Sequence, residues 1–173
     1  MTLIPQHLIF IDFEASGLGP DSWPIEVGLA WIENDTVEKW SSLICPEPNW
    51  NENAWSSQSA SIHKIQREEL RSAPSAANVA SDLLHRIHGK HVVSDAVAHD
   101  HWWAELLLEP LGFQPPPFAS IEKVITAACK GNSALIHHVH AQLNGTPRPH
   151  RAGPDAARLA EAILLAMKLR AEN

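Results

Sequence analysis

The feature that most constrains the fold is a short apolar run near the N-terminus that carries acidic side chains. Residues 8–13 are apolar or aromatic except for Asp12, and Glu14 follows two positions later. Such a run indicates a buried strand, on which side chains two apart project from the same face. Two carboxylates side by side at the end of a core strand repel each other, and a divalent cation is the simplest remedy. The alternative is an edge strand whose acidic side chains point into water.

The size and composition of the chain indicate one globular domain over residues 1–173. Hydrophobic residues make up 45% of the sequence and charged residues 19%, which is typical of folded proteins rather than disordered ones. The two cysteines, Cys45 and Cys129, are too few for a disulfide scaffold. Residues 1–6 lack the pattern of a signal peptide, and no apolar run approaches the roughly 20 residues that cross a membrane. We therefore expect a cytoplasmic protein without membrane association.

The net charge limits the kind of partner. A formal charge of −7 argues against a protein that holds long nucleic acid on a broad basic surface. It does not exclude a nucleic-acid enzyme, because metal ions can supply positive charge where a phosphate binds.

The order of the expected elements favours an α/β fold. Residues 9–13, 25–32 and 36–45 are strand-like, and Asn34 with Asp35 suits a tight turn, so we expect an antiparallel meander. Residues 46–61 have the composition of an irregular surface loop. The later elements are a helix from Pro74 or Ser75 to Gly89, a strand at 91–94, helices at 100–111, 122–130 and 133–144, a short strand at 118–121, and a last helix with Pro154 in its first turn. Strands followed by alternating strands and helices indicate a mixed sheet flanked by helices.

Three further residues are candidates for a site with Asp12 and Glu14. Asp100 follows the strand at 91–94 and is expected to be the N-cap of the next helix. Asp155 falls in the first turn of the last helix, where a carboxylate is favoured, and His150 lies in the irregular segment before that helix. Taken singly, each has an ordinary explanation, as a helix-start residue or a loop histidine.

Together, the order and spacing of these residues resemble the DnaQ-like DEDDh family of 3′–5′ exonucleases, within the RNase H-like superfamily. The resemblance rests on Asp12-x-Glu14, on Asp100 after a strand, and on His150-x4-Asp155, and it extends over nearly the whole chain. It implies an RNase H-like fold with a mixed, mainly five-stranded sheet flanked by helices. It also implies that the four acidic residues bind metal and that His150 is the general base.

The chemistry implied by this resemblance suits the residue types. Carboxylate oxygens select hard cations such as Mg²⁺ or Mn²⁺, and two such cations can bind a scissile phosphate. Water would be the nucleophile, and a histidine with its ordinary pKa of about 6.5 can accept the proton. The expected substrates are single-stranded DNA or RNA 3′ ends or short oligonucleotides, and the expected products are nucleoside 5′-monophosphates.

The resemblance further implies contacts with the terminal nucleotide. Leu18 would lie against the last base, and backbone groups nearby would hold the last sugar. The full set of implied substrate contacts is Ala15, Ser16, Gly17, Leu18 and His63. Separately, Arg148 and Arg151 flank His150, which makes them candidates for contacts with phosphate.

One segment departs from the family pattern. The family commonly has His-Asn where this chain has Asp95-Ala96, and phenylalanine where it has His99. Asp95 is therefore a rival to Asp100 for the middle ligand, or an additional carboxylate near the metals. The spacing and the start of the helix favour Asp100.

Three hypotheses about function follow. The leading one is a metal-dependent 3′–5′ exonuclease. The second is an oligoribonuclease-like enzyme restricted to very short RNA, and the third is a nucleic-acid-binding module of the same fold with an impaired site. The sequence does not distinguish DNA from RNA as the substrate, nor does it give the substrate length. The oligomeric state is also open, and a homodimer is one alternative.

Overall fold

A five-stranded mixed sheet organises the computed structural model, which describes residues 7–172; the expectation about residues 1–6 lies outside that range. The strands are β1 (Leu8–Ala15), β2 (Pro24–Glu33), β3 (Thr36–Leu43), β4 (His91–Ser94) and β5 (Ala119–Ser120), in the spatial order β3-β2-β1-β4-β5. The first three strands pair antiparallel, whereas β4 pairs parallel with both β1 and β5. The predicted meander and mixed sheet are confirmed.

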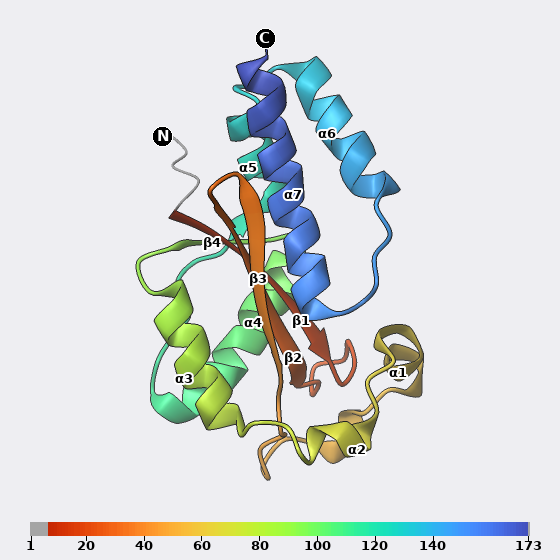
Figure 1. Ribbon diagram of the computed structural model, residues 1–173. Helices are drawn as coiled ribbons and strands as arrows, with labels where there is room; N and C mark the ends of the chain where they lie inside the picture. The colour runs from red at the N-terminus through yellow and green to blue at the C-terminus, as the bar shows by residue number, and fades with distance from the viewer. Residues whose placement is uncertain (1–6, 173) are drawn as a thin grey trace.

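Helices cover both faces of this sheet, as predicted. Figure 1 shows α7 along one face, with α3 and α4 on the opposite side and α1 and α2 beyond the ends of β1 and β2. Within residues 7–172, no helix has the length and apolar character that crossing a membrane requires. The helices are α1 (Ser57–His63), α2 (Arg67–Leu70), α3 (Ala76–Ile87), α4 (Val97–Leu108), α5 (Ile121–Ala128), α6 (Ser133–Gly145) and α7 (Ala152–Ala171), with short 3₁₀ turns η2 (Glu52–Ala54) and η3 (Glu109–Leu111).

The two rows of side chains on β1 have different surroundings. One row belongs to the core that includes residues of α3 and α4. The other row begins with Leu8 and Phe10, which pack into the core that includes α5 and α7. Asp12 and Glu14 continue this second row by the strand's two-residue period, so they point to the α7 side of the sheet. The carboxylates therefore begin where the apolar row ends.

Gly28 on β2 lets the start of α7 lie directly against the sheet. It pairs with Asp12 on β1. A Cβ atom at Gly28 would lie 2.0 Å from the carbonyl carbon of Ala152 and 2.2 Å from the amide nitrogen of Gly153. Any larger residue would push α7 away, so this glycine sets the distance between Asp155 and the carboxylates of β1.

Two predicted boundaries are wrong. Residues 46–61 are not wholly irregular, because they contain η2 and the start of α1, which Ser56 caps by accepting a hydrogen bond from the Ser59 amide. The helix predicted from Asp100 begins at Val97 with Ala96 as its N-cap. Asp100 is thus in the first turn of α4, and its side chain is directed to other partners.

Candidate active site

The four acidic residues singled out in the sequence meet at the end of β1. Asp12 and Glu14 come from β1, Asp100 from the first turn of α4, and Asp155 from the first turn of α7. The aspartates are 1–3% exposed, whereas Glu14 is partly buried. β1 thus contributes two carboxylates, and α4 and α7 contribute one each. The structure brings residues of the first strand and of the last helix to one place.

These side chains form two groups that could each hold a cation. Within each group, one ligand atom from every residue lies within 4.8 Å of the others. The buried oxygens Oδ2 of Asp12 and Oδ1 of Asp155 have no hydrogen-bond partner among residues 7–172. Buried carboxylate oxygens are normally satisfied, so these oxygens and the oxygen-rich donor set fit a divalent metal. The groups are Glu14, His150 and Asp155, and Asp12, Asp95 and Asp100.

Burial and mutual repulsion make the ionised forms of these carboxyls costly. Burial, followed by the charges of Asp100 and Glu14, raises the pKa of Asp12 well above its ordinary value. Burial is also the main reason that the pKa of Glu14 and that of Asp100 are each raised to about 7. The pKa of Asp155 is raised chiefly by burial as well. Clustered carboxyls with raised pKa values are typical of functional sites, and a bound cation would favour their ionised forms.

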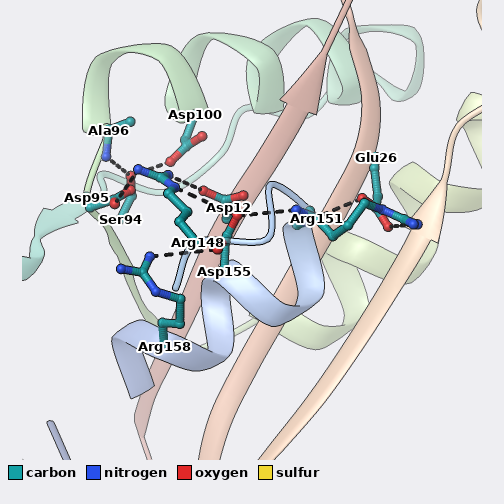
Figure 2. Close-up of polar contacts among 11 residues, drawn as sticks. Asp12, Glu26, Ser94, Asp95, Ala96, Asp100, Arg148, Arg151, Asp155 and Arg158 are labelled. Carbon is teal, nitrogen blue, oxygen red and sulfur yellow. Dashed lines mark hydrogen bonds and ion pairs between the residues drawn. The ribbon is translucent and has the colours of Figure 1, made fainter. Parts of the chain in front are cut away.

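Ser94 fixes the direction of the Asp100 side chain. Its buried hydroxyl donates a hydrogen bond to Oδ2 of Asp100 and accepts one from the Ala96 amide at 2.9 Å. Figure 2 shows this arrangement at the end of β4, with Asp95 beside it. The Asp95 side chain is 24% exposed, in contrast to the buried Asp100. Both candidates for the middle ligand are therefore at the site, Asp100 inside it and Asp95 at its rim.

His150 enters the site from the segment before α7. Its backbone has a φ of +53°, a left-handed conformation that is uncommon for a residue other than glycine. The ring is partly buried, and a ring nitrogen belongs to the group with Glu14 and Asp155. The sharp turn at His150 thus directs both its own side chain and the following helix toward the carboxylates.

Arg151 anchors the start of α7 to the sheet. Its guanidinium donates two hydrogen bonds to the buried carboxylate of Glu26 on β2, at 2.8 and 2.9 Å, and the Ala152 amide donates a third at 3.1 Å (Figure 2). The Arg151 amide in turn donates to Oδ2 of Asp155 at 3.2 Å. Arg151 was a candidate for a phosphate contact, but its guanidinium is engaged by Glu26.

Arg148 lies among the carboxylates themselves. Its guanidinium nitrogens lie 3.3 Å from Oδ1 of Asp12, 3.4 Å from Oδ2 of Asp95 and 3.7 Å from Oδ2 of Asp155 (Figure 2). Burial lowers the pKa of Arg148, but Asp95, Asp12 and Asp155 raise it by more, so the guanidinium stays charged. A cation is thus already part of the cluster.

A cavity of about 300 Å³ opens beside the carboxylates. Its walls include Ala15 at the end of β1, Gly17 and Leu18 in the turn that follows, and Ile62 and His63 at the end of α1. Leu18 is 75% exposed and Ile62 45% exposed, so the rim is apolar. Exposed apolar side chains at a polar cleft indicate a ligand with an apolar face.

Two of the residues predicted to contact substrate, Ser16 and His63, accept hydrogen bonds from backbone amides of the protein. Ser16 does not line the cavity: its hydroxyl accepts a hydrogen bond from the Trp23 amide at 3.0 Å, and its carbonyl accepts one from the Ser56 amide at 2.7 Å. His63 does line the cavity, and its Nδ1 accepts a hydrogen bond from the Ile65 amide at 3.0 Å. Burial lowers the pKa of His63, which favours the neutral ring.

Several residues that build the site are not evident from the sequence. Ser94 ends the short strand β4, which has no recognisable motif, and the Glu26–Arg151 pair joins residues far apart in the chain. Gly28 carried a usable signal, because a glycine within an apolar strand often marks a close backbone approach. Ile62 belongs to residues 61–65, which resemble the family's loop beside the substrate, but nothing in the sequence singled out its side chain as part of the cavity rim.

Comparisons with known proteins agree with this geometry. The RNase T family model, described as "Exonuclease", matches residues 9–163 of the chain. Over 115 residues the chain is 32% identical to one component of the ATP-dependent helicase/nuclease of Syntrophomonas wolfei, a match that covers 58% of this chain and 9% of that protein. The chain therefore spans only a small part of this curated relative.

Solved structures with the same fold include several exonucleases. A 3′-exonuclease that recognises the histone mRNA stem-loop superposes with a TM-score of 0.67 at 16% identity, over 93% of this chain and 63% of that chain. Exonuclease I of E. coli, in complex with a dA16 oligonucleotide, gives a TM-score of 0.64 at 16% identity, over 94% of this chain and 42% of that chain. The nuclease domain of 3′hExo, a DEDDh family member bound to rAMP, gives 0.60 at 18% identity, over 96% and 92%. These likenesses show a shared RNase H-like fold, and the match over residues 9–163 shows that the chain belongs to the DnaQ-like RNase T exonuclease family.

Proposed function

We propose that this domain is a metal-dependent 3′–5′ exonuclease that releases nucleoside 5′-monophosphates from the 3′ ends of single-stranded DNA or RNA. The observation that carries the proposal is the convergence of Asp12, Glu14, Asp100, Asp155 and His150 beside one cavity. Membership in an exonuclease family supports the reaction type.

The four carboxylates would hold two divalent cations, Mg²⁺ or Mn²⁺. When bound, such cations stabilise the charge on a scissile phosphate and on the leaving oxygen, and they make water a better nucleophile. Oδ2 of Asp12 and Oδ1 of Asp155 accept no hydrogen bond from residues 7–172, which supports this use of the site; the nearest cation to the second oxygen is Nη1 of Arg158, at 3.7 Å. Glu14 and Asp100, each with a pKa raised to about 7, would be ionised more readily beside a cation.

His150 is the general base of the proposed reaction. Its ring lies in one group with Glu14 and Asp155, at the mouth of the cavity. A neutral imidazole can accept the proton of the attacking water, and the nearby carboxylates then stabilise the imidazolium that forms.

The cavity supports binding of one terminal nucleotide. Leu18 and Ile62 offer apolar surface to a base, while Ala15 and Gly17 bring the backbone to the cavity wall. Apolar contact is tolerant of base identity, which suits an enzyme that removes successive nucleotides. The net charge of −7 favours short or single-stranded ends over long duplexes.

Polarity of digestion tests the proposal directly. DNA and RNA oligonucleotides labelled at the 5′ or 3′ end are incubated with Mn²⁺ or Mg²⁺, and in parallel with EDTA. We expect 3′-labelled strands to release labelled mononucleotide at once and 5′-labelled strands to shorten stepwise, with both reactions stopped by EDTA. His150→Ala should lower turnover at least ~100-fold, in line with loss of a general base. Release from the 5′ end, internal cleavage, or inertness of folded protein with either metal would contradict the proposal.

A further inference from the structure

Arg148 differs from an ordinary ion-pair partner in how it shares its charge. Each of three guanidinium nitrogens faces a different carboxylate: Nη2 faces Asp12, Nη1 faces Asp95 and Nε faces Asp155. The distances, 3.3–3.7 Å, are longer than the roughly 2.7–2.9 Å of a close charge-assisted hydrogen bond. The side chain is 42% exposed. The contact with Asp12 is a long hydrogen bond and the other two are ion-pair contacts, so Arg148 is held mainly by the summed charge of the cluster.

Arg148 faces two of the carboxylates that are suited to a metal, although on each it approaches the oxygen opposite the one that lacks a hydrogen-bond partner. Oδ1 of Asp12 and Oδ2 of Asp155 belong to carboxylates of the two cation-holding groups. A guanidinium and a divalent cation that share the same carboxylates repel each other. The divalent charge is the larger, so metal binding would favour movement of Arg148 away from Asp12 and Asp155.

Asp95 provides a place for the guanidinium at the rim. It is more exposed than Asp100, and it follows β4 where the side chain faces Arg148. In the structure, Arg148 lines the cavity together with His150, so a guanidinium that stays beside Asp95 would remain close to a bound substrate. A planar guanidinium binds the oxygens of a phosphate in a fork, and it remains charged at all working pH values.

We propose that Arg148 is a substrate-binding residue that competes with divalent cations for Asp12 and Asp155 and, retained by Asp95, contacts the phosphate at the cleavage site. The phosphate contact rests on the proposed function. The competition for carboxylates does not, because it concerns the protein and metal alone. Arg148 thus neutralises the carboxylates until metal and substrate arrive together.

Calorimetric titration with Mn²⁺, in the absence of nucleic acid, tests the competition. Arg148→Ala should bind Mn²⁺ about 3- to 10-fold more tightly than the wild type, because the competing charge is gone. Asp95→Asn should bind Mn²⁺ more weakly, since the guanidinium then interacts with Asp12 and Asp155 alone, and adding Arg148→Ala should abolish that loss. Arg71→Ala, which removes an exposed arginine after α2, is the matched control and should change nothing.

Steady-state kinetics on a 3′-labelled oligonucleotide test the phosphate contact. At saturating Mn²⁺, Arg148→Ala should lower kcat/KM at least ~10-fold despite its tighter metal binding, and Arg148→Lys should recover part of it. Equal or weaker Mn²⁺ binding by a folded Arg148→Ala protein would overturn the competition. Unchanged kcat/KM would overturn the phosphate contact while leaving the proposed nuclease intact. If the wild type binds Mn²⁺ but cleaves no 3′ end, the proposed function fails and the phosphate contact with it, while the titration still decides the competition.

Discussion

Two arginines three positions apart, Arg148 and Arg151, have opposite kinds of partner. Arg151 makes two short hydrogen bonds, 2.8 and 2.9 Å, to the single buried carboxylate of Glu26. Arg148 lies 3.3–3.7 Å from three carboxylates and satisfies none of them fully. The first arrangement is directed and saturated, as a structural clamp requires. The second is shared, so its energy depends on the charge state of the site.

The difference separates the scaffold from the reactive centre. Glu26 and Gly28 belong to the same row of β2, and both contact the start of α7. Together they hold the backbone that carries Asp155. Asp12 and Glu14, on the neighbouring strand, face the same helix but lie among like charges, which the shared guanidinium of Arg148 offsets only in part. One end of α7 thus carries a stabilising contact and a repulsive one side by side.

Breaking the contact of α7 with the sheet should have the largest effect. Gly28→Ala places a Cβ atom 2.0 Å from the backbone of Ala152, so α7 must move or the strand must distort. We expect a loss of about 3 kcal/mol or more in the free energy of unfolding, measured by urea denaturation. Gly145→Ala, at an α6 position where a Cβ atom meets none of the described residues within 4 Å, should change it by no more than about 1 kcal/mol. A Gly28→Ala protein as stable as the wild type would contradict the close approach.

Arg151→Ala should lower the free energy of unfolding less than Gly28→Ala does, but more than Arg148→Ala does. Arg151→Ala leaves the buried carboxylate of Glu26 with only the Ala152 amide as a donor. We expect a loss of about 2 kcal/mol, below the range for fully buried pairs because the Arg151 side chain is 45% exposed. Adding Glu26→Gln to Arg151→Ala should recover part of this loss by removing the unpaired charge. In contrast, Arg148→Ala should change stability by less than about 1 kcal/mol. An equal loss for both arginines, measured in the same urea series, would remove the distinction drawn between them.

The clustered carboxyls predict a smaller effect, on how the stability of the fold depends on pH. Glu14 and Asp100 have pKa values raised from ordinary values of 4.5 and 3.8 to about 7 in the folded protein. Between these limits the folded state binds more protons than the unfolded state, so their contribution lowers stability as pH rises from about 4 to 7. In EDTA, the double variant Glu14→Gln/Asp100→Asn should therefore lose less stability than the wild type over this range. Thermal unfolding at about pH 5, 6 and 7 measures the difference.

Glu109→Gln, at an exposed position, should leave the pH profile of the wild type unchanged. Mn²⁺ should reduce the decline in the wild type, because a bound cation favours the ionised carboxylates. Parallel profiles for the wild type and the double variant in EDTA would show that the pKa values of Glu14 and Asp100 are not raised in the folded protein.

The sequence predicted the elements of the fold better than the contacts that position the site. Two-residue alternation placed Asp12 and Glu14 on one face of a strand, and the first turn of the last helix placed Asp155 correctly. Asp100 was expected to be the N-cap of α4 but lies in the first turn of that helix. There its side chain accepts a hydrogen bond from the Ser94 hydroxyl and does not cap α4. Periodicity reports which face a residue occupies, but it contains no information about partners on other elements.

Long-range pairs show this limit most clearly. Arg148 and Arg151 flank His150 closely in the sequence, and both were candidates for phosphate contacts. Only the folded chain distinguishes them, because Glu26 lies 125 residues from Arg151 and Asp12 lies 136 residues from Arg148. The apolar rim likewise depends on α1, which brings Ile62 next to the same cavity as Leu18.

The most direct test of the whole account is the rate of 3′-nucleotide release by Asp12→Asn at saturating Mn²⁺. We expect at least a ~1,000-fold loss of turnover, on the order of that seen when a group essential to the transition state is removed. The variant should melt in EDTA at or above the temperature of the wild type, since a repelled buried charge is gone. A folded Asp12→Asn protein that releases 3′ nucleotides at a rate within about 10-fold of the wild type would contradict the claim that these carboxylates form the catalytic centre.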